Sequence, residues 1–195
     1  MFGDPDFFNV TQLKETGMWP FTFLSAYGMM PYLKRTPGEL VGLEIGVLKA
    51  ENMVTILENC PNVKMIYGID PFKEHTDYET ERTKEQMKEY ERIALENLSE
   101  FEGRYSIVKK TSKAAAKDFG KDEQFDFILI DGDHSYEGVT NDLKAYYPLL
   151  KKGGHVFVHD NNRESVMKAM VDFRNENKLR MPMHTSKNFI SFWNK

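Results

Sequence analysis

Short apolar segments alternate with amphipathic segments along most of the chain, and few folds accommodate such an alternation. Five of the apolar segments have the length and composition of strands, and a helical pattern follows each of them. The predicted strands cover residues 40–46, 64–70, 105–108, 127–130 and 154–160. Strands and helices that alternate in this way form a parallel sheet with right-handed crossovers, so an α/β fold is expected.

The C-terminus departs from this alternation. Residues 179–185 and 189–193 are both strand-like, and only about three residues separate them. A parallel crossover needs about a dozen residues or more, so these two strands must form an antiparallel hairpin. The expected fold is a single Rossmann-like, doubly wound sheet of seven strands, mostly parallel, with a C-terminal antiparallel hairpin and helices on both faces.

The length of 195 residues suits one domain with a sizeable core, which is expected to span residues 39–195. Residues 1–38 are rich in aromatic residues and methionine and are interrupted by prolines, so they are predicted to form a helical cap segment. The cap is expected to cover the sheet. It could in addition form an adaptable substrate pocket, since methionine and aromatic side chains line such pockets.

Composition limits the classes of partner. A net charge of -4 does not indicate attraction to nucleic acid or to an anionic membrane. The sequence lacks an apolar run near the ~20 residues of a membrane span, and its N-terminus lacks the pattern of a signal peptide. Its one cysteine, Cys60, fits a reducing compartment, so a cytoplasmic location is expected. The expected partner is a small molecule, and a homo-oligomer is compatible with the sequence.

Polar residues follow the fourth and fifth strands at the point where each strand ends. Asp131 comes directly after one apolar run, and Asp160 and Asn161 come after the other. Ligands of open α/β sheets bind outside the carboxyl ends of the strands, so these side chains converge if the two strands are neighbours. Their oxygen atoms are the ligands that Mg²⁺ or Mn²⁺ prefers, which predicts a metal site. Helix capping or orientation of a cofactor is the alternative for the two acids.

A histidine lies on the same loop as the first of these acids. His134 lies on this loop directly after Asp133. Histidine is the side chain best suited to accept a proton near neutral pH. His134 and Asp131 are therefore predicted to be catalytic, with His134 as a general base, although a lone histidine is more often structural. His159 is expected to point away from Asp160 and to be structural, because side chains alternate along a strand.

The turn after the first strand has the features of a nucleoside site. A full glycine fingerprint would have glycines at positions 46, 48 and 50, but Leu48 and Ala50 replace the last two, which argues against a pyrophosphate ligand. Asp70 ends the second strand. Its separation from Gly46 is close to the roughly 20 residues that lie between the glycine turn and the acid that holds the ribose hydroxyls in dinucleotide-binding folds. Glu44 suits a cationic ligand. A tight turn and a strand-end turn residue are the structural alternatives.

Several short motifs occur in a fixed order, namely Glu44-Ile-Gly46, Ile69-Asp70-Pro71, Asp131-Gly-Asp133-His134-Ser-Tyr136, Gly153-Gly154 and His159-Asp160. In this order they resemble the class I S-adenosylmethionine-dependent methyltransferases. Within that class the chain is most similar to the group near macrocin O-methyltransferase and cephalosporin hydroxylase proteins. The resemblance covers about residues 40 to 195.

This resemblance implies roles for individual residues. Glu44 and Gly46 would line the methionine end of the cofactor, Asp70 would hold the ribose and Ser112 would contact the adenine. Asp131 would lie at the cofactor as well. Metal-dependent O-methyltransferases carry an acid after strand four and an Asp-Asn pair after strand five, and this chain matches that spacing.

The leading hypothesis is therefore an enzyme that moves a methyl group from S-adenosylmethionine to a hydroxyl of a small, sugar-like acceptor with the help of a metal. A nicotinamide-dependent oxidoreductase is one alternative, disfavoured by the missing phosphate cradle and the terminal hairpin. A non-catalytic nucleoside-binding module is another, disfavoured by the cluster of acids and histidine. The fold alone does not choose among them.

Overall fold

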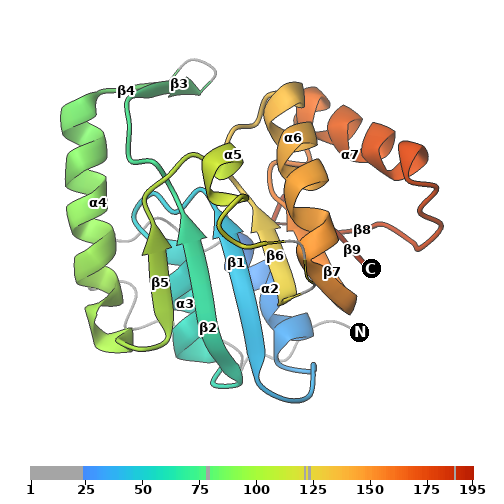
Figure 1. Ribbon diagram of the computed structural model, residues 1–195, viewed down its shortest axis with the longest axis horizontal. Coiled ribbons are helices and arrows are strands. Elements are labelled where there is room, and N and C mark those ends of the chain that lie inside the picture. Colours follow the sequence, from blue (N-terminus) through green and yellow to red (C-terminus); the bar gives the residue numbers. More distant parts are fainter. Residues whose placement is uncertain (1–23, 78–79, 121, 123, 187) are drawn as a thin grey trace.

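A seven-stranded sheet with helices on both faces forms the centre of the computed structural model, as Figure 1 shows. The structure describes residues 24–77, 80–120, 122, 124–186 and 188–195, so most of the predicted cap, residues 1–23, lies outside the described residues. The strands of the sheet are β1 (Leu40–Ile45), β2 (Val63–Ile69), β5 (Tyr105–Val108), β6 (Phe125–Ile130), β7 (Leu150–Val158), β8 (His184–Thr185) and β9 (Ser191–Asn194).

The strand order is β5-β2-β1-β6-β7-β9-β8, and it confirms the predicted topology. Parallel pairing joins β5, β2, β1, β6 and β7, whereas β9 runs antiparallel to both β7 and β8. The order reverses at β1 and β6, because the chain adds strands on one side of β1 first and on the other side afterwards. Open α/β sheets bind their ligands in the crevice at such a reversal.

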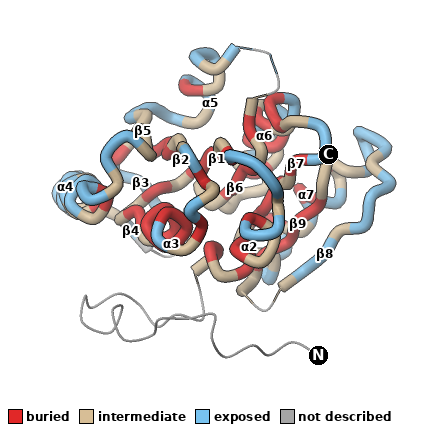
Figure 2. The backbone as a smooth tube through the Cα atoms, turned by 90° about the horizontal axis from the view of Figure 1, so that it is seen from below, coloured by how far each residue is buried: buried red, intermediate tan, exposed pale blue. Residues whose placement is uncertain are grey.

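The helices cover the sheet in two layers, each with its own apolar core. Buried residues of α2, α3 and α4 pack on one face, and those of α6 and α7 pack on the other. Successive residues of β6 point to opposite faces, so Phe127 belongs to the first core and Ile128 to the second. Figure 2 shows buried backbone along the inner elements and exposed backbone on α4 and β8. The helices are α2 (Ser25–Leu33), α3 (Glu51–Asn59), α4 (Lys84–Leu98), α5 (Ser112–Ala115), α6 (Tyr136–Tyr146) and α7 (Glu164–Glu176), with 3₁₀ turns η2 (Ser99–Phe101) and η3 (Tyr147–Leu149).

Side-chain caps explain where two of the site-facing helices begin. The Thr111 hydroxyl accepts a hydrogen bond from the Ala114 amide at the start of α5, and the Ser135 hydroxyl accepts one from the Gly138 amide at the start of α6. Thr111 is therefore the N-cap of α5, and Ser135 is the N-cap of α6. Both caps lie at the carboxyl end of the sheet.

The structure differs from the predicted elements in several places, among them the fifth strand, which begins at Leu150 and ends at Val158. The strands β3 (His75–Asp77) and β4 (Thr80–Arg82) pair in a small antiparallel hairpin that was not among the predicted strands, because these segments lack the alternating apolar pattern of a strand. Only residues 184–185 of the predicted strand 179–185 are in the sheet, because β8 pairs with the short β9 alone. The helix after the third predicted strand is limited to α5, Ser112–Ala115.

None of the helices in the described part of the chain combines the length and the apolar character that a membrane crossing requires.

Candidate active site

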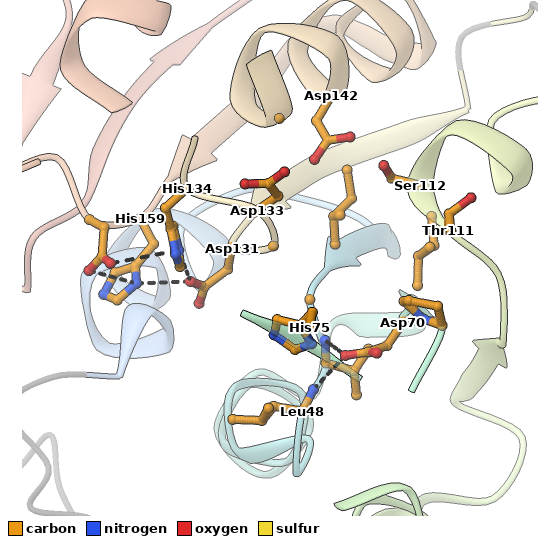
Figure 3. A pocket seen from close by; sticks show the side chains of 18 of the residues that line it. Leu48, Asp70, His75, Thr111, Ser112, Asp131, Asp133, His134, Asp142 and His159 are labelled. Carbon is orange, nitrogen blue, oxygen red and sulfur yellow. Dashed lines mark hydrogen bonds and ion pairs between the residues drawn. The ribbon is translucent and has the colours of Figure 1, made fainter. Parts of the chain in front are cut away.

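A cavity of 760 Å³ lies at the carboxyl ends of the central strands, where the strand order reverses. Figure 3 shows its walls: Asp131, His134 and His159 lie on one side, Asp70 and Leu48 on a second, and Ser112 with Asp142 on a third. A cavity of this size suits a ligand as large as a nucleoside with a second small molecule beside it.

A carboxylate and two imidazoles form the polar centre of the cavity. Asp131 Oδ1 lies 2.9 Å from His159 Nδ1 and 3.4 Å from His134 Nε2. Ligating atoms of these three residues all lie within 4.8 Å of one another, and their side chains are only 12 to 16% exposed. The sequence therefore placed Asp131 and His134 together correctly, but the nearer imidazole partner of Asp131 is His159.

The prediction that His159 points away from Asp160 is wrong. Strand β7 ends at Val158, and Asp160 has a φ of 56°, so the alternation of a strand does not continue to these residues. His159 Nδ1 instead lies 3.4 Å from Asp160 Oδ1, and both residues line the cavity. The end of the strand and the unusual backbone conformation at Asp160 together bring a second histidine into the site.

The residues predicted as metal ligands are brought together only in part. Asp160 Oδ2 lies 3.7 Å from His134 Nε2 and accepts a 2.5 Å contact from Arg163 Nε, so Asp160 belongs to the same cluster as Asp131. The Asn161 side chain donates through Nδ2 to Ser191 Oγ on β9, at 3.0 Å, and is not among the residues that line the cavity. Asp131 and Asp160 thus share His134 and His159 as neighbours, whereas the amide nitrogen of Asn161 points toward β9.

The charges in this cluster are mutually dependent. Burial alone would raise the pKa of Asp131, but the charges and hydrogen bonds of His159 and His134 outweigh it and hold that pKa well below its usual range. Burial alone would lower the pKa of His159, but the Asp131 carboxylate, with help from Asp160, raises it. An ionised Asp131 beside a readily protonated His159 is the expected state near neutral pH.

Asn52 is a site residue that the sequence patterns did not reveal. Its Nδ2 donates to Glu44 Oε1 and to Asp131 Oδ2, both at 3.2 Å, and its Oδ1 accepts from the Ala26 amide at 3.1 Å. The Ser25 hydroxyl also donates to Asp131 Oδ2, at 3.3 Å. Asn52 therefore connects the start of α2, the first strand and the cavity, and its place in the first turn after the glycine turn was the one available signal.

Glu44 lies beneath the cavity rather than on its wall. It is 2% exposed, and burial, reinforced by the nearby charge of Asp131, raises its pKa well above the usual range despite the opposing hydrogen bond from Asn52. Its second oxygen, Oε2, is buried and has no hydrogen-bond partner among the described residues. A cationic group arriving above this carboxyl would stabilise its charged form.

The turn after β1 keeps the backbone shape of a glycine-rich loop without the glycines. Gly46 has a φ of 90°, and Leu48 and Ala50 adopt φ values of 51° and 63°, in the left-handed region that glycine normally supplies. The Val47 and Leu48 amides both donate to Asp70 Oδ2, at 3.1 and 3.0 Å. These amides are therefore already occupied by a carboxylate of the chain itself, which leaves no cradle for a pyrophosphate there.

Asp70 lies on the cavity wall, yet most of its hydrogen-bonding capacity holds the backbone. Besides the two amides of the turn, the Phe72 amide donates to Asp70 Oδ1 at 2.7 Å. An ionised carboxylate can accept about four hydrogen bonds, so roughly one position remains for a ligand hydroxyl. Ser112 also lines the cavity, and its backbone carbonyl accepts a hydrogen bond from the Tyr146 hydroxyl at 2.6 Å, which fixes α5 against α6.

Comparison with known proteins gives a match over more than half of the chain. Residues 43–161 match the family described as Methyltransferase domain. A curated relative, the uncharacterized protein R132 of Acanthamoeba polyphaga mimivirus, is 46% identical over 35 residues. That aligned part is 18% of this chain and spans only 16% of the viral protein.

Solved structures with the same fold include several O-methyltransferases. The O-methyltransferase NovP has a TM-score of 0.67 at 17% identity, with 87% of this chain and 78% of that chain covered. An O-methyltransferase from Bacillus cereus in complex with SAH has a TM-score of 0.64 at 14% identity, covering 94% and 88%. MycE, a methyltransferase from the mycinamycin biosynthetic pathway in complex with Mg, SAH and mycinamycin VI, has a TM-score of 0.55 at 15% identity, covering 87% and 47%. At these identities the likeness establishes the fold.

Proposed function

Since this chain belongs to the methyltransferase-domain family, we propose that it transfers a methyl group from S-adenosylmethionine to a hydroxyl of a small, sugar-like acceptor with the help of a divalent cation. The observation that carries the proposal is the cluster of Asp131, His134 and His159 on the wall of a nucleoside-sized cavity. Such a cluster combines a group that can take up a proton with charges that can position the reactants.

The chemistry of the cavity fits S-adenosylmethionine, whose methionine end carries an ammonium and a sulfonium. Beneath the cavity, Glu44 Oε2 has no hydrogen-bond partner in the described part of the chain. Asp131 adds an ionised carboxylate on the cavity wall, so this end of the cavity favours a cation. Asp70 has an acceptor position left for a ribose hydroxyl. Among the structural neighbours, the Bacillus cereus enzyme is a complex with SAH, the demethylated product S-adenosylhomocysteine.

In the proposed reaction His134 takes the proton from the acceptor hydroxyl as the oxygen attacks the methyl carbon. The S–CH₃ bond breaks as the O–CH₃ bond forms, and the neutral thioether of S-adenosylhomocysteine leaves. Asp131 and Asp160 lie at neighbouring strand ends and would hold the cation, with Asn161 as the predicted third ligand. A cation bound there would lower the pKa of the acceptor hydroxyl. The carboxylate oxygens of Asp131 and Asp160 are donors of the kind that Mg²⁺ or Mn²⁺ prefers.

The acceptor is proposed to bind under the N-terminal segment, residues 1–38, against the domain formed by residues 39–195. Leu24 and Ser25, which begin the described part of that segment, line the same cavity as Asp131. A hydroxyl placed between Ser25 and His134 would lie beside the acid–imidazole cluster. This arrangement would use one segment both to cover the sheet and to enclose the acceptor.

Addition of S-adenosylhomocysteine at about 100 times its Kd is expected to stabilise the native chain by about 2.7 kcal/mol, because a ligand that binds only the folded state stabilises it by mass action. For a chain of this length that corresponds to a rise in Tm of roughly 5 to 10 °C. NAD at the same concentration should leave the Tm unchanged. A thermal shift with NAD alone would instead support the oxidoreductase, and a shift without any methyl transfer to polyhydroxylated acceptors would support the non-catalytic module.

Removal of divalent cations is expected to abolish methyl transfer while the S-adenosylhomocysteine-induced rise in Tm remains. The cation is assigned to the acceptor side of the cavity, so the nucleoside keeps its contacts in the chelated protein. Turnover should return with added Mg²⁺ or Mn²⁺ and should not return in Asp160→Asn at the same cation concentration. Full turnover in the presence of chelator would contradict the cation, while leaving methyl transfer by His134 in place.

A further inference from the structure

The two oxygens of the Asp131 carboxylate have different partners. Oδ1 faces the imidazoles, at 2.9 Å from His159 Nδ1 and 3.4 Å from His134 Nε2, and Figure 3 shows both contacts. Oδ2 faces the starts of two helices, where it accepts hydrogen bonds from Asn52 Nδ2 at 3.2 Å and from the Ser25 hydroxyl at 3.3 Å. One oxygen therefore serves the cluster of the proposed reaction, and the other is held by the chain.

The contacts at Oδ2 decide where Oδ1 points. The terminal torsion of an aspartate has a broad energy minimum, so without these contacts the carboxylate of Asp131 could turn about its last bond. Two donors on Oδ2 fix the plane of the carboxylate, and Oδ1 then stays beside both imidazoles. Reacting groups keep a productive geometry only when neighbouring side chains lock their rotamers in this way.

The amide of Asn52 fits its surroundings in one orientation. Its Oδ1 accepts from the Ala26 amide at 3.1 Å, and its Nδ2 donates to Glu44 Oε1 and to Asp131 Oδ2, both at 3.2 Å. In the reverse orientation the amide oxygen would face two carboxyl groups, and the amide nitrogen would face a backbone N–H. Asn52 is only 9% exposed, so the loss of these partners would leave buried polar groups unsatisfied.

The same side chain also caps α2. Leu24, the residue before this helix, makes no side-chain cap, and Asn52 instead accepts the hydrogen bond of the Ala26 amide in the first turn. Ser25, the second donor to Asp131, is the first residue of α2. The helices α2 and α3, which carry the two donors, lie on the same face of the sheet (Figure 1). The orientation of Asp131 therefore depends on how the first turn of α2 is seated.

We propose that Asn52 is a positioning residue for methyl transfer, which acts through Asp131 and links the rate of the transfer step to the seating of α2; this inference rests on the proposed function. In this assignment Asn52 touches neither the acceptor hydroxyl nor the methyl group. It keeps Asp131 Oδ1 beside His134, the proposed base. A misplacement of about 1 Å can slow a reaction about 10²-fold, so the loss of Asn52 should appear in the transfer step.

Single-turnover methyl transfer by Asn52→Ala, at saturating S-adenosylmethionine and acceptor, tests this assignment. The rate is expected to fall about 10- to 100-fold, the range for the loss of a hydrogen bond to a charged acceptor. The KM of the acceptor should stay near its wild-type value, because the acceptor keeps its own contacts. Ser25→Ala removes the second donor but leaves the cap of α2 in place, so it should slow the same step by a smaller factor.

Asn62 provides the matched control at the other end of α2. Its Nδ2 donates to the carbonyl oxygens of Leu33 at 2.9 Å and of Thr36 at 3.1 Å. Asn62→Ala thus removes a similar pair of hydrogen bonds from the same helix without a change at Asp131. This variant should lower the Tm, as Asn52→Ala should, but it should keep the wild-type rate below its unfolding temperature.

The possible outcomes separate the two levels of the assignment. A wild-type rate in Asn52→Ala, or an equal fall in Asn52→Ala and Asn62→Ala, would overturn the positioning role alone. If Asn52→Ala does not fold, a wild-type rate in Ser25→Ala would overturn it in the same way. A wild-type chain that transfers no methyl group to any polyhydroxylated acceptor would overturn the proposed function, and the positioning role with it.

Discussion

Replacement of His134 with alanine is expected to slow methyl transfer about 10²- to 10⁴-fold in a single turnover, the usual contribution of a general base. A neutral hydroxyl is a poor nucleophile, and the imidazole of His134 lies beside the two carboxylates that would position it, Asp131 at 3.4 Å and Asp160 at 3.7 Å. The affinity for S-adenosylhomocysteine should change little, because His134 is assigned to the acceptor and not to the nucleoside.

The pH profile of the same reaction gives a second readout. A histidine acts as a base only when it is neutral, so the wild-type rate should rise with pH through the pKa of His134 and then level off. The rising limb should be absent in His134→Ala. Single-turnover rates from pH 5 to about pH 9, a range that spans an ordinary histidine pKa, measure both effects.

His159 is the matched control, because it is a second imidazole on the same carboxylate. Its Nδ1 lies 2.9 Å from Asp131 Oδ1, and its Nε2 is buried without a hydrogen-bond partner among the described residues, so it is less able than His134 to face an acceptor. His159→Ala should lower stability but retain the rising pH limb. A full loss of rate in His159→Ala, with wild-type rates in His134→Ala, would assign the base to His159.

The sheet could be predicted because its strands are buried on both faces. Ile128 and Leu129 are both 0% exposed although they point to opposite faces of the sheet. A strand buried on both faces is a continuous apolar run, which can be recognised in the sequence. The polar residue that ends such a run then has a defined place, which is why Asp131 could be assigned to the cavity. The hairpin followed from the short connection before β9, because few connections are possible at that length.

The contacts within the site could not be predicted, because they depend on backbone conformations that the residue types at those positions do not predict. Leu48, Ala50 and Asp160 adopt positive φ values although none of them is glycine. In the turn that contains Leu48 and Ala50, the amides of Val47 and Leu48 donate to Asp70, so that the acid holds the turn as well as facing the cavity. At Asp160 the positive φ places the adjacent His159 against Asp131. Such conformations are imposed by tertiary packing and not by local propensity.

Asn52 illustrates a second limit. A single amide side chain on a helix is ordinary in sequence, and its value here comes from three groups that the fold brings to it: Glu44, Asp131 and the amide of Ala26. Its place in the first turn after the glycine turn is the one signal in the sequence, and its residue type does not distinguish it from a solvent-facing asparagine. Only the packing of α2 and α3 over the end of β1 makes it part of the site.

Gly46→Ala is expected to destabilise the chain by roughly 2 to 6 kcal/mol, which combines about 1 to 3 kcal/mol for an unfavourable backbone conformation with a similar amount for overpacking. Gly46 has a φ of 90°, and a Cβ atom there would lie 2.2 Å from the carbonyl oxygen of Asp131 and 2.9 Å from the Cα of Gly132. These are backbone atoms held by the hydrogen bond from the Asp131 amide to the Ile45 carbonyl, at 2.9 Å, so they cannot rotate away as a side chain would.

Gly38→Ala separates the two contributions. Gly38 has a nearly equal φ of 87°, but nothing lies within 4 Å of the Cβ that alanine would add, so this variant carries the backbone cost alone. Urea unfolding should therefore show a clearly larger loss for Gly46→Ala, equivalent to a fall in Tm of roughly 5 to 20 °C. The clash also pushes Asp131 away from β1, so Gly46→Ala should weaken S-adenosylhomocysteine binding whereas Gly38→Ala should not. Equal losses of stability in the two variants, with nucleoside binding intact in both, would mean that the ends of β1 and β6 can separate without disturbing the site.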